Sequence, residues 1–102
     1  MVKLAVRWSE QSKIDLKEIF LYIKNVESHE RAKYVVSNIR IVANMITPFP
    51  TKHAKEPFIT DIDVRYIVKW SYKILFTIEE KHVNIVRIFH TSQNPAKLIY
   101  TT

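Results

Sequence analysis

The sequence predicts an α+β fold with the element order β-α-α-β-β-β, in which an antiparallel sheet carries an N-terminal helical hairpin on one face. Two observations lead to this prediction. An alternating apolar pattern at residues 2–8 is followed by two stretches with helical spacing. Three more alternating stretches then follow in the second half of the chain. At 102 residues, positions 1–102 are expected to form a single domain.

The first strand and the first helix are predicted from residues 2–25. Residues 2–8 alternate, so one face of this strand is expected to be apolar, with Val2, Leu4, Val6 and Trp8. Ser9 or Ser12 can then cap a helix, and Asp15 completes a weak capping box with Ser12. Apolar residues at helical spacing follow, namely Leu16, Ile19, Phe20 and Ile23. The first helix is therefore expected over about residues 10–25.

The second helix has the clearest periodicity in the chain. Ser28 is the expected N-cap, and Glu30 lies favourably in the first turn. A single apolar stripe then extends over four turns, with Ala32, Val35, Val36, Ile39, Val42, Ala43 and Ile46. Pro48 ends the helix. Because few residues separate the two helices, we expect them to pack antiparallel against the sheet.

The second half of the chain predicts three consecutive strands. Residues 49–63 contain two prolines and no period, which indicates a long connection with one short element at most. Residues 64–70 alternate, and Trp70 and Ser71 form the expected turn into the next strand. Residues 72–79 and 83–89 then form a β-hairpin around the polar turn 80–82. Its exit brings His90 to the rim of the sheet, where a side chain can meet a partner.

The alternation also predicts which side chains face away from the helices. On residues 64–70, the set Val64, Tyr66, Val68 and Trp70 is assigned to the helix side. The open face of the sheet is then expected to be basic, with Lys3, Arg7, Arg65, Lys69 and Lys73. The last strand has apolar residues at both odd and even positions, as a central strand does. The pattern therefore does not decide which of its residues face the helices.

Composition excludes several classes of function. The chain has no glycine and no cysteine, which excludes glycine-rich phosphate loops, disulfides and thiolate chemistry. No apolar run is long enough for a membrane span, and no secretory signal is present, so a cytoplasmic protein without membrane contact is expected. The net charge of +6 favours nucleic acid or an acidic protein as the partner. Residues 31–60 alone carry five basic side chains against Glu56, a local charge of +4.

At this point the chain resembles the ParE/RelE superfamily of bacterial toxin–antitoxin toxins. The resemblance covers nearly the whole chain and rests on Trp8-Ser9, Asp15-Leu16, Ile19, Tyr22-Ile23, Arg65, Tyr72-Lys73-Ile74-Leu75-Phe76, Ile85-Val86-Arg87-Ile88-Phe89-His90 and Gln93-Asn94-Pro95. It implies a toxin neutralised by a small antitoxin that wraps the helices and the sheet. ParE-like members act on DNA gyrase, whereas RelE-like members cut mRNA on the ribosome.

The candidate site residues depend on which branch applies. A RelE-like nuclease would use His90 as acid or base, with Lys73 and Arg65 around the phosphate. Glu56 is a guess for the base, and Tyr100 is a packing residue or a remnant of a catalytic aromatic. Target or antitoxin binding is assigned to the basic residues and the histidine of the sheet, namely Arg7, Arg65, Lys69, Lys73, Arg87 and His90.

We prefer the ParE-like alternative, for two reasons. Lysine at position 73 cannot clamp a phosphate as arginine does, and the tail after His90 lacks the arginine that many RelE-like nucleases carry. A third alternative is an inactive antitoxin-binding module. No cofactor is expected, and His29, His53 and His82 are predicted to be surface residues because they have no metal-ligand spacing. Trp8 and Trp70 are interpreted as core or rim anchors.

Overall fold

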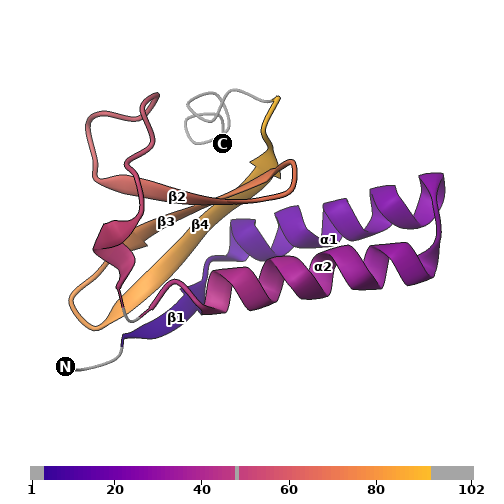
Figure 1. The fold of residues 1–102 in the computed structure, drawn as a ribbon, viewed down its shortest axis with the longest axis horizontal. Coiled ribbons are helices and arrows are strands. Elements are labelled where there is room, and N and C mark those ends of the chain that lie inside the picture. Colours follow the sequence, from indigo (N-terminus) through magenta and orange to yellow (C-terminus); the bar gives the residue numbers. More distant parts are fainter. Residues whose placement is uncertain (1–3, 48, 93–102) are drawn as a thin grey trace.

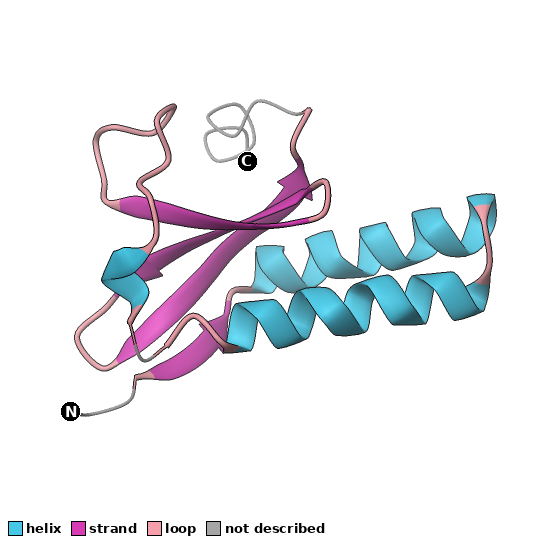
Figure 2. Cartoon of the chain, in the orientation of Figure 1, coloured by secondary structure: helices cyan, strands magenta, loops and turns pink. Residues whose placement is uncertain are grey.

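The computed structural model describes residues 4–47 and 49–92 of the chain (Figure 1). The elements follow in the order β1 (Ala5–Trp8), α1 (Glu10–Val26), α2 (His29–Asn44), the short 3₁₀ helix η1 (Pro50–Lys52), β2 (Val64–Lys69), β3 (Tyr72–Ile78) and β4 (His82–His90). This is the predicted β-α-α-β-β-β order. The two helices form an antiparallel hairpin against one face of the sheet, and their distal half extends beyond it (Figure 2). The α+β fold class is confirmed.

The sheet is mixed, which corrects the prediction of a purely antiparallel sheet. Its strand order is β1-β4-β3-β2, and β2, β3 and β4 are antiparallel neighbours. The edge strand β1, however, pairs parallel to β4, from Ala5↔His82 to Trp8↔Ile85. An alternating pattern shows which side chains share a face but not which way a strand runs. The parallel direction of β1 relative to β4 is therefore visible only in the tertiary structure.

Serine side chains cap both helices. Ser9 Oγ accepts a hydrogen bond from the Ser12 backbone N–H at 3.0 Å, which decides between the two predicted caps of α1. Ser28 Oγ accepts from the Arg31 N–H at 3.0 Å and caps α2 as predicted. Each cap satisfies one of the backbone donors that the first helical turn leaves unpaired. The Ser9 cap fixes where α1 begins after β1, and the Ser28 cap fixes where α2 begins after the short connection between the helices.

Two apolar clusters lie on opposite faces of the sheet. The larger joins the helices to the sheet and includes the predicted α2 stripe together with Leu16, Ile23, Ile74, Phe76, Val83, Ile85 and Ile88. The smaller lies on the other face, beneath the connection between η1 and β2, and consists of Ile59, Val64, Leu75 and Phe89 with Tyr66 and Val86 against them. The second face is thus partly covered by the chain itself.

The register of β2 reverses the predicted facing of that strand. Arg65 pairs with Phe76 and Ile67 with Ile74, and both partners belong to the helix-side core. Arg65, Ile67 and Lys69 therefore share the helix side, whereas Tyr66 pairs with Leu75 on the other face. The prediction that Arg65 and Lys69 lie on the open face with Lys73 was wrong. Both parities of this strand hold apolar residues, so alternation alone does not fix its facing.

A β-bulge explains why the facing of β4 could not be read from its sequence. Phe76 pairs with Ile85 and Leu75 pairs with Arg87, so Val86 is an extra residue. Ile85 and Ile88 lie in the helix-side core, although their spacing of three would place them on opposite faces of a regular strand. Because of the bulge, odd-numbered residues such as Ile85 face the helices before it and even-numbered residues such as Ile88 face them after it. Apolar residues therefore occur at both odd and even positions of β4.

The predicted turn at Trp70 and Ser71 joins β2 to β3 and is strained. Trp70 has φ = 54°, the one positive φ among the described residues. A bulky side chain is disfavoured in this region, and the chain has no glycine to place there. The Trp70 ring lies 5.9 Å from the Tyr34 ring, which anchors the turn to α2 and confirms its interpretation as a rim residue. Within the described part of the chain, neither long helix has the length and apolarity needed to cross a bilayer.

Candidate functional site

Lys73 lies on the sheet face away from the helices, where its charge is already paired. Its Nζ is 2.7 Å from Glu56 Oε2, and the two side chains are 17% and 0% exposed. The same Nζ lies 4.2 Å from the centre of the Tyr66 ring. Glu56 is held in place by its backbone N–H, which donates to the Val64 carbonyl. Glu56, which the sequence left as a guess for a base, is therefore the buried counterion of Lys73.

Arg65 fixes the connection that precedes β2. Its guanidinium donates to the backbone carbonyls of Thr51 at 3.1 Å and His53 at 2.8 Å. Its Nε lies 3.6 Å from Asp63 Oδ1, and the side chain is mostly buried. Because Arg65 pairs with Phe76 in the sheet, it lies four residues along β3 from Tyr72, the partner of His90. Arg65 thus shares no site with His90.

Arg87 forms a two-point ion pair with a residue of α1. Its Nε is 2.8 Å from Asp15 Oδ2, and its second nitrogen, Nη2, is 3.1 Å from Asp15 Oδ1. The Ile88 backbone N–H also donates to Asp15 Oδ2 at 3.0 Å. Asp15 is buried, and Arg87 is 14% exposed. The pair therefore joins α1 to β4, and its signal in the sequence is a carboxylate beside the apolar stripe of α1.

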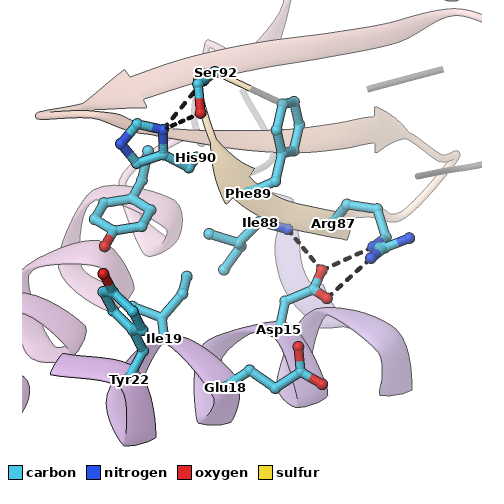
Figure 3. A pocket seen from close by; sticks show the side chains of 10 residues that line it. Asp15, Glu18, Ile19, Tyr22, Arg87, Ile88, Phe89, His90 and Ser92 are labelled. Atoms are coloured by element: carbon cyan, nitrogen blue, oxygen red, sulfur yellow. Dashed lines mark hydrogen bonds and ion pairs between the residues drawn. The ribbon is translucent and has the colours of Figure 1, made fainter. Parts of the chain in front are cut away.

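His90 borders an open pocket of about 580 Å³ between α1 and the end of the β3–β4 hairpin (Figure 3). Its Nδ1 accepts from the Ser92 backbone N–H at 3.1 Å and lies 2.8 Å from Ser92 Oγ. The Tyr72 ring packs edge-on to the imidazole at 5.8 Å. Since the pocket is formed with α1, His90 and Lys73 lie on opposite faces of the sheet. The three residues of the nuclease alternative, Lys73, Arg65 and His90, are not brought together.

The two remaining basic candidates lie elsewhere. Arg7 is exposed on the edge strand β1, where it pairs with Asn84. Lys69 lies with its Nζ 4.5 Å from the centre of the Trp70 ring, at the opposite edge of the sheet. Lys3, Gln93-Asn94-Pro95 and Tyr100 lie outside the described residues. Within the described chain, no three His, Cys, Asp or Glu side chains group as a metal site.

A basic groove that the sequence reasoning missed lies between the two helices. It measures about 450 Å³, and its lining consists of Lys13, Leu16, Lys17, Phe20, Lys33, Val36, Ser37 and Arg40. An adjoining hollow of about 270 Å³ shares Lys13, Leu16 and Arg40 and extends to Trp8. Among the described residues, Lys13 alone of the four cations has an acidic partner, Glu10 at 3.4 Å. Helical spacing of cations beside the apolar stripes was the available signal. We name the larger hollow, of about 450 Å³, the interhelix groove.

His53 is partly buried, which corrects its prediction as a surface residue. Its ring packs edge-on to Phe76 at 5.7 Å, and its Nε2 is buried without a hydrogen-bond partner in the described part of the structure. Burial lowers the pKa of His53 below the ordinary 6.5, and the charges of Lys52 and Arg65 lower it further. The folded protein therefore favours the neutral imidazole, whereas the unfolded chain takes up a proton near pH 6.5.

We expect acidification below about pH 6.5 to destabilise the fold through His53. The unfolded state then binds more protons at this residue than the folded state, so the free energy of unfolding falls as the pH decreases. Urea unfolding at pH 7.5 and at pH 5.0 measures this loss. Between these pH values His53→Leu is expected to lose less free energy of unfolding than the wild type. The control His29→Gln, at an exposed position, is expected to lose the same amount as the wild type. Parallel losses in His53→Leu and wild type would contradict the prediction.

Comparison with known proteins identifies the family. Residues 6–95 match the model of the ParE toxin of the type II toxin–antitoxin system parDE. The chain belongs to the ParE toxin family. No curated protein matches its sequence. The fold also matches solved structures, which share too little sequence to indicate more than the fold.

Two of these structures come from toxin–antitoxin systems. The chromosomal ParDE system of P. aeruginosa matches with a TM-score of 0.73 and 20% identity, covering 85% of this chain and 95% of that one. The toxin–antitoxin complex RelBE2 of Mycobacterium tuberculosis matches with a TM-score of 0.65 and 18% identity, covering 91% and 97%. This member of the ParE toxin family thus shares the fold of both structures.

Proposed function

We propose that this toxin acts as a binding inhibitor of DNA gyrase and does not cut RNA. The observation that carries the proposal is the buried ion pair between Lys73 and Glu56, at 2.7 Å. A ribonuclease needs uncompensated cations around the scissile phosphate. Here Lys73, one of the cations that the nuclease alternative would use, is already paired with Glu56 from the protein's own connection. Membership of the ParE family gives independent support.

The separation of the other candidates supports the same proposal. General acid–base catalysis requires the proton donor and the charge-stabilising groups within hydrogen-bond reach of one reacting atom. His90 faces the pocket beside α1, whereas Lys73 lies beneath the η1–β2 connection on the other face of the sheet. Arg65 is engaged with the carbonyls of Thr51 and His53. No single phosphate could contact all three side chains without rearrangement of the fold.

Two assays on one preparation test the proposed activity. We expect the purified toxin to inhibit supercoiling by gyrase and to leave ribosome-bound mRNA intact. Site-specific cleavage of translated mRNA that is lost in His90→Ala would replace gyrase inhibition with the RelE-like alternative. We also propose that the toxin acts in the cytoplasm. Its induced expression without the antitoxin should arrest the growth of the cells. Normal growth with soluble, folded toxin would favour an inactive antitoxin-binding module.

The antitoxin is proposed to place an acidic amphipathic segment in the interhelix groove. Both structural neighbours are toxin–antitoxin systems. The groove combines an apolar floor at Leu16, Phe20 and Val36 with a rim of four cations. A segment with acidic residues on both sides of an apolar stripe would match both features. A short acidic-tailed protein encoded next to this toxin is the expected partner.

Reversal of two rim charges should weaken antitoxin binding. We expect Lys17→Glu with Lys33→Glu to raise the Kd by roughly 10–100-fold at low salt, because attraction becomes repulsion at both helices. Calorimetry at two salt concentrations measures the change, and the wild-type affinity should fall as salt rises. The control is Lys24→Glu with Lys81→Glu, which changes the net charge equally at exposed positions outside the groove. Equal losses in both double variants would exclude the groove as the binding surface.

A further inference from the structure

The pocket beside His90 has chemistry opposite to that of the interhelix groove. Residues on a different face of α1 line it, among them Glu18, Ile19 and Tyr22 (Figure 3). Tyr72 from β3 also belongs to the lining. Its volume of about 580 Å³ lies within the range of small-ligand pockets. Because α1 contributes different faces to the two hollows, both can be occupied at once. The pocket therefore needs an explanation separate from antitoxin binding.

The charges that border the pocket leave one carboxylate uncompensated. Asp15 is neutralised by the two-point pair with Arg87 and by the Ile88 N–H. Glu18, one turn further along α1, has no hydrogen bond or ion pair with any described residue. The Nδ1 atom of His90 accepts a hydrogen bond from the Ser92 backbone N–H. Among the described residues, Glu18 is therefore an unpaired carboxylate at this pocket, on a protein with a net charge of +6.

Tyrosine rings form the remaining walls. Tyr22 is 65% exposed at the pocket rim, and Tyr72 is half-buried against His90. Burial raises the pKa of Tyr72 above its ordinary value of 10.0, and the neighbouring Tyr22 and Glu27 raise it further. The Tyr72 phenol is therefore neutral at physiological pH, and the rings of both tyrosines offer electron-rich faces. Aromatic faces beside a carboxylate are the groups that recognise organic cations.

We propose that this pocket binds the guanidinium or ammonium group of a basic side chain on a partner protein. The cation pairs with Glu18 and lies against the ring of Tyr22, while Ile19 contacts the aliphatic stem of the side chain. An anion finds better partners in the interhelix groove, where three cations lack acidic partners among the described residues. The proposal does not depend on gyrase as the target, since any partner that presents an arginine or lysine at this end of the sheet fits it.

The test compares a charged side chain with its neutral isostere. N-acetyl-arginine methylamide and N-acetyl-citrulline methylamide are titrated into the full-length toxin at low salt, and the side-chain NMR signals of tyrosine and histidine are followed. We expect saturable shifts at Tyr22, Tyr72 and His90 with the arginine compound, and at least about fivefold weaker binding of the citrulline compound. Equal binding of the two compounds, or shifts that do not saturate, would overturn the proposal.

Matched variants separate the carboxylate from the ring. Glu18→Gln should weaken the arginine compound about fivefold and leave the citrulline compound unchanged, whereas Glu30→Gln, an exposed acid on α2, should leave both unchanged. Tyr22→Leu should weaken the arginine compound, and Tyr22→Phe, which keeps the ring, should not. Full affinity in Glu18→Gln would overturn the assignment, as would inorganic phosphate producing the same shifts. Gyrase inhibition is measured separately, so either proposal can fail alone.

Discussion

Replacing Asp15 with alanine is expected to lower the free energy of unfolding by about 3–5 kcal/mol. The substitution leaves the guanidinium of Arg87, 14% exposed, without the carboxylate that it contacts at 2.8 and 3.1 Å. It also removes the acceptor of the Ile88 backbone N–H. The guanidinium thus loses this ion pair and the Ile88 N–H loses its acceptor between α1 and β4, where both losses are costly. Equilibrium unfolding in urea measures the loss.

The control for Asp15 lies on the same helix. Glu10→Ala breaks the exposed pair with Lys13, whose side chains are 89% and 59% exposed, and should cost less than about 0.5 kcal/mol. If Asp15→Ala does not fold, Asp15→Asn keeps the shape and one acceptor and should show a smaller loss. Asp15→Leu with Arg87→Met removes both charges and should recover much of the stability. A loss from Asp15→Ala no larger than that from Glu10→Ala would contradict the structural role.

Replacing Lys73 with methionine is expected to cost about 3 kcal/mol, because it leaves the fully buried carboxylate of Glu56 without its cation. Glu56 Oε1 is already buried without a hydrogen-bond partner among the described residues, so little other compensation is available there. The connection that Glu56 belongs to should loosen from the sheet. Hydrogen exchange reports this directly at the amides of Glu56 and Tyr66, which bond to Val64 and Ala54 across the connection.

Lys69→Met is the matched control, since it removes the same charge from the neighbouring strand. Lys69 lies over the Trp70 ring at 4.5 Å and has no acidic partner among the described residues, so its loss should be small. Glu56→Leu with Lys73→Met should recover stability relative to Lys73→Met alone. If Lys73→Met is as stable as Lys69→Met and exchange at Glu56 is unchanged, the ion pair does not hold the connection.

Sequence patterns were most reliable where one period was unambiguous. The apolar stripe from Ala32 to Ile46 predicts both α2 and the face that it buries, because seven apolar residues at helical spacing lie on one side of the helix. The serine before each helix predicts a cap because its hydroxyl can reach the orphan amides of the first turn. The superfamily resemblance rested on short motifs in order along nearly the whole chain, from Trp8-Ser9 to Gln93-Asn94-Pro95. It was confirmed by the match over residues 6–95.

The site was predicted less well, because the sequence does not show whether a basic side chain is exposed to solvent or paired with another group in the fold. Lys73, Arg65 and Arg87 were chosen for their charge, but each has a partner distant in sequence, namely Glu56, Thr51 and Asp15. Such pairs depend on which strands meet and in which register. Conversely, Lys17 and Lys33 were passed over although the helical hairpin brings them to the rim of one groove.

The sequence by itself determined the element order, the Ser28 cap of α2, the absence of thiolate and glycine-loop chemistry, and the superfamily, since these depend on local spacing and residue type. Only the tertiary structure decided the parallel pairing of β1 with β4, the facing of β2, and the bulge that makes both parities of β4 apolar. It also decided which charges remain available to a partner. The physical reason is that strand direction, register and charge pairing arise between segments far apart in the chain, and these interactions leave no period in the sequence.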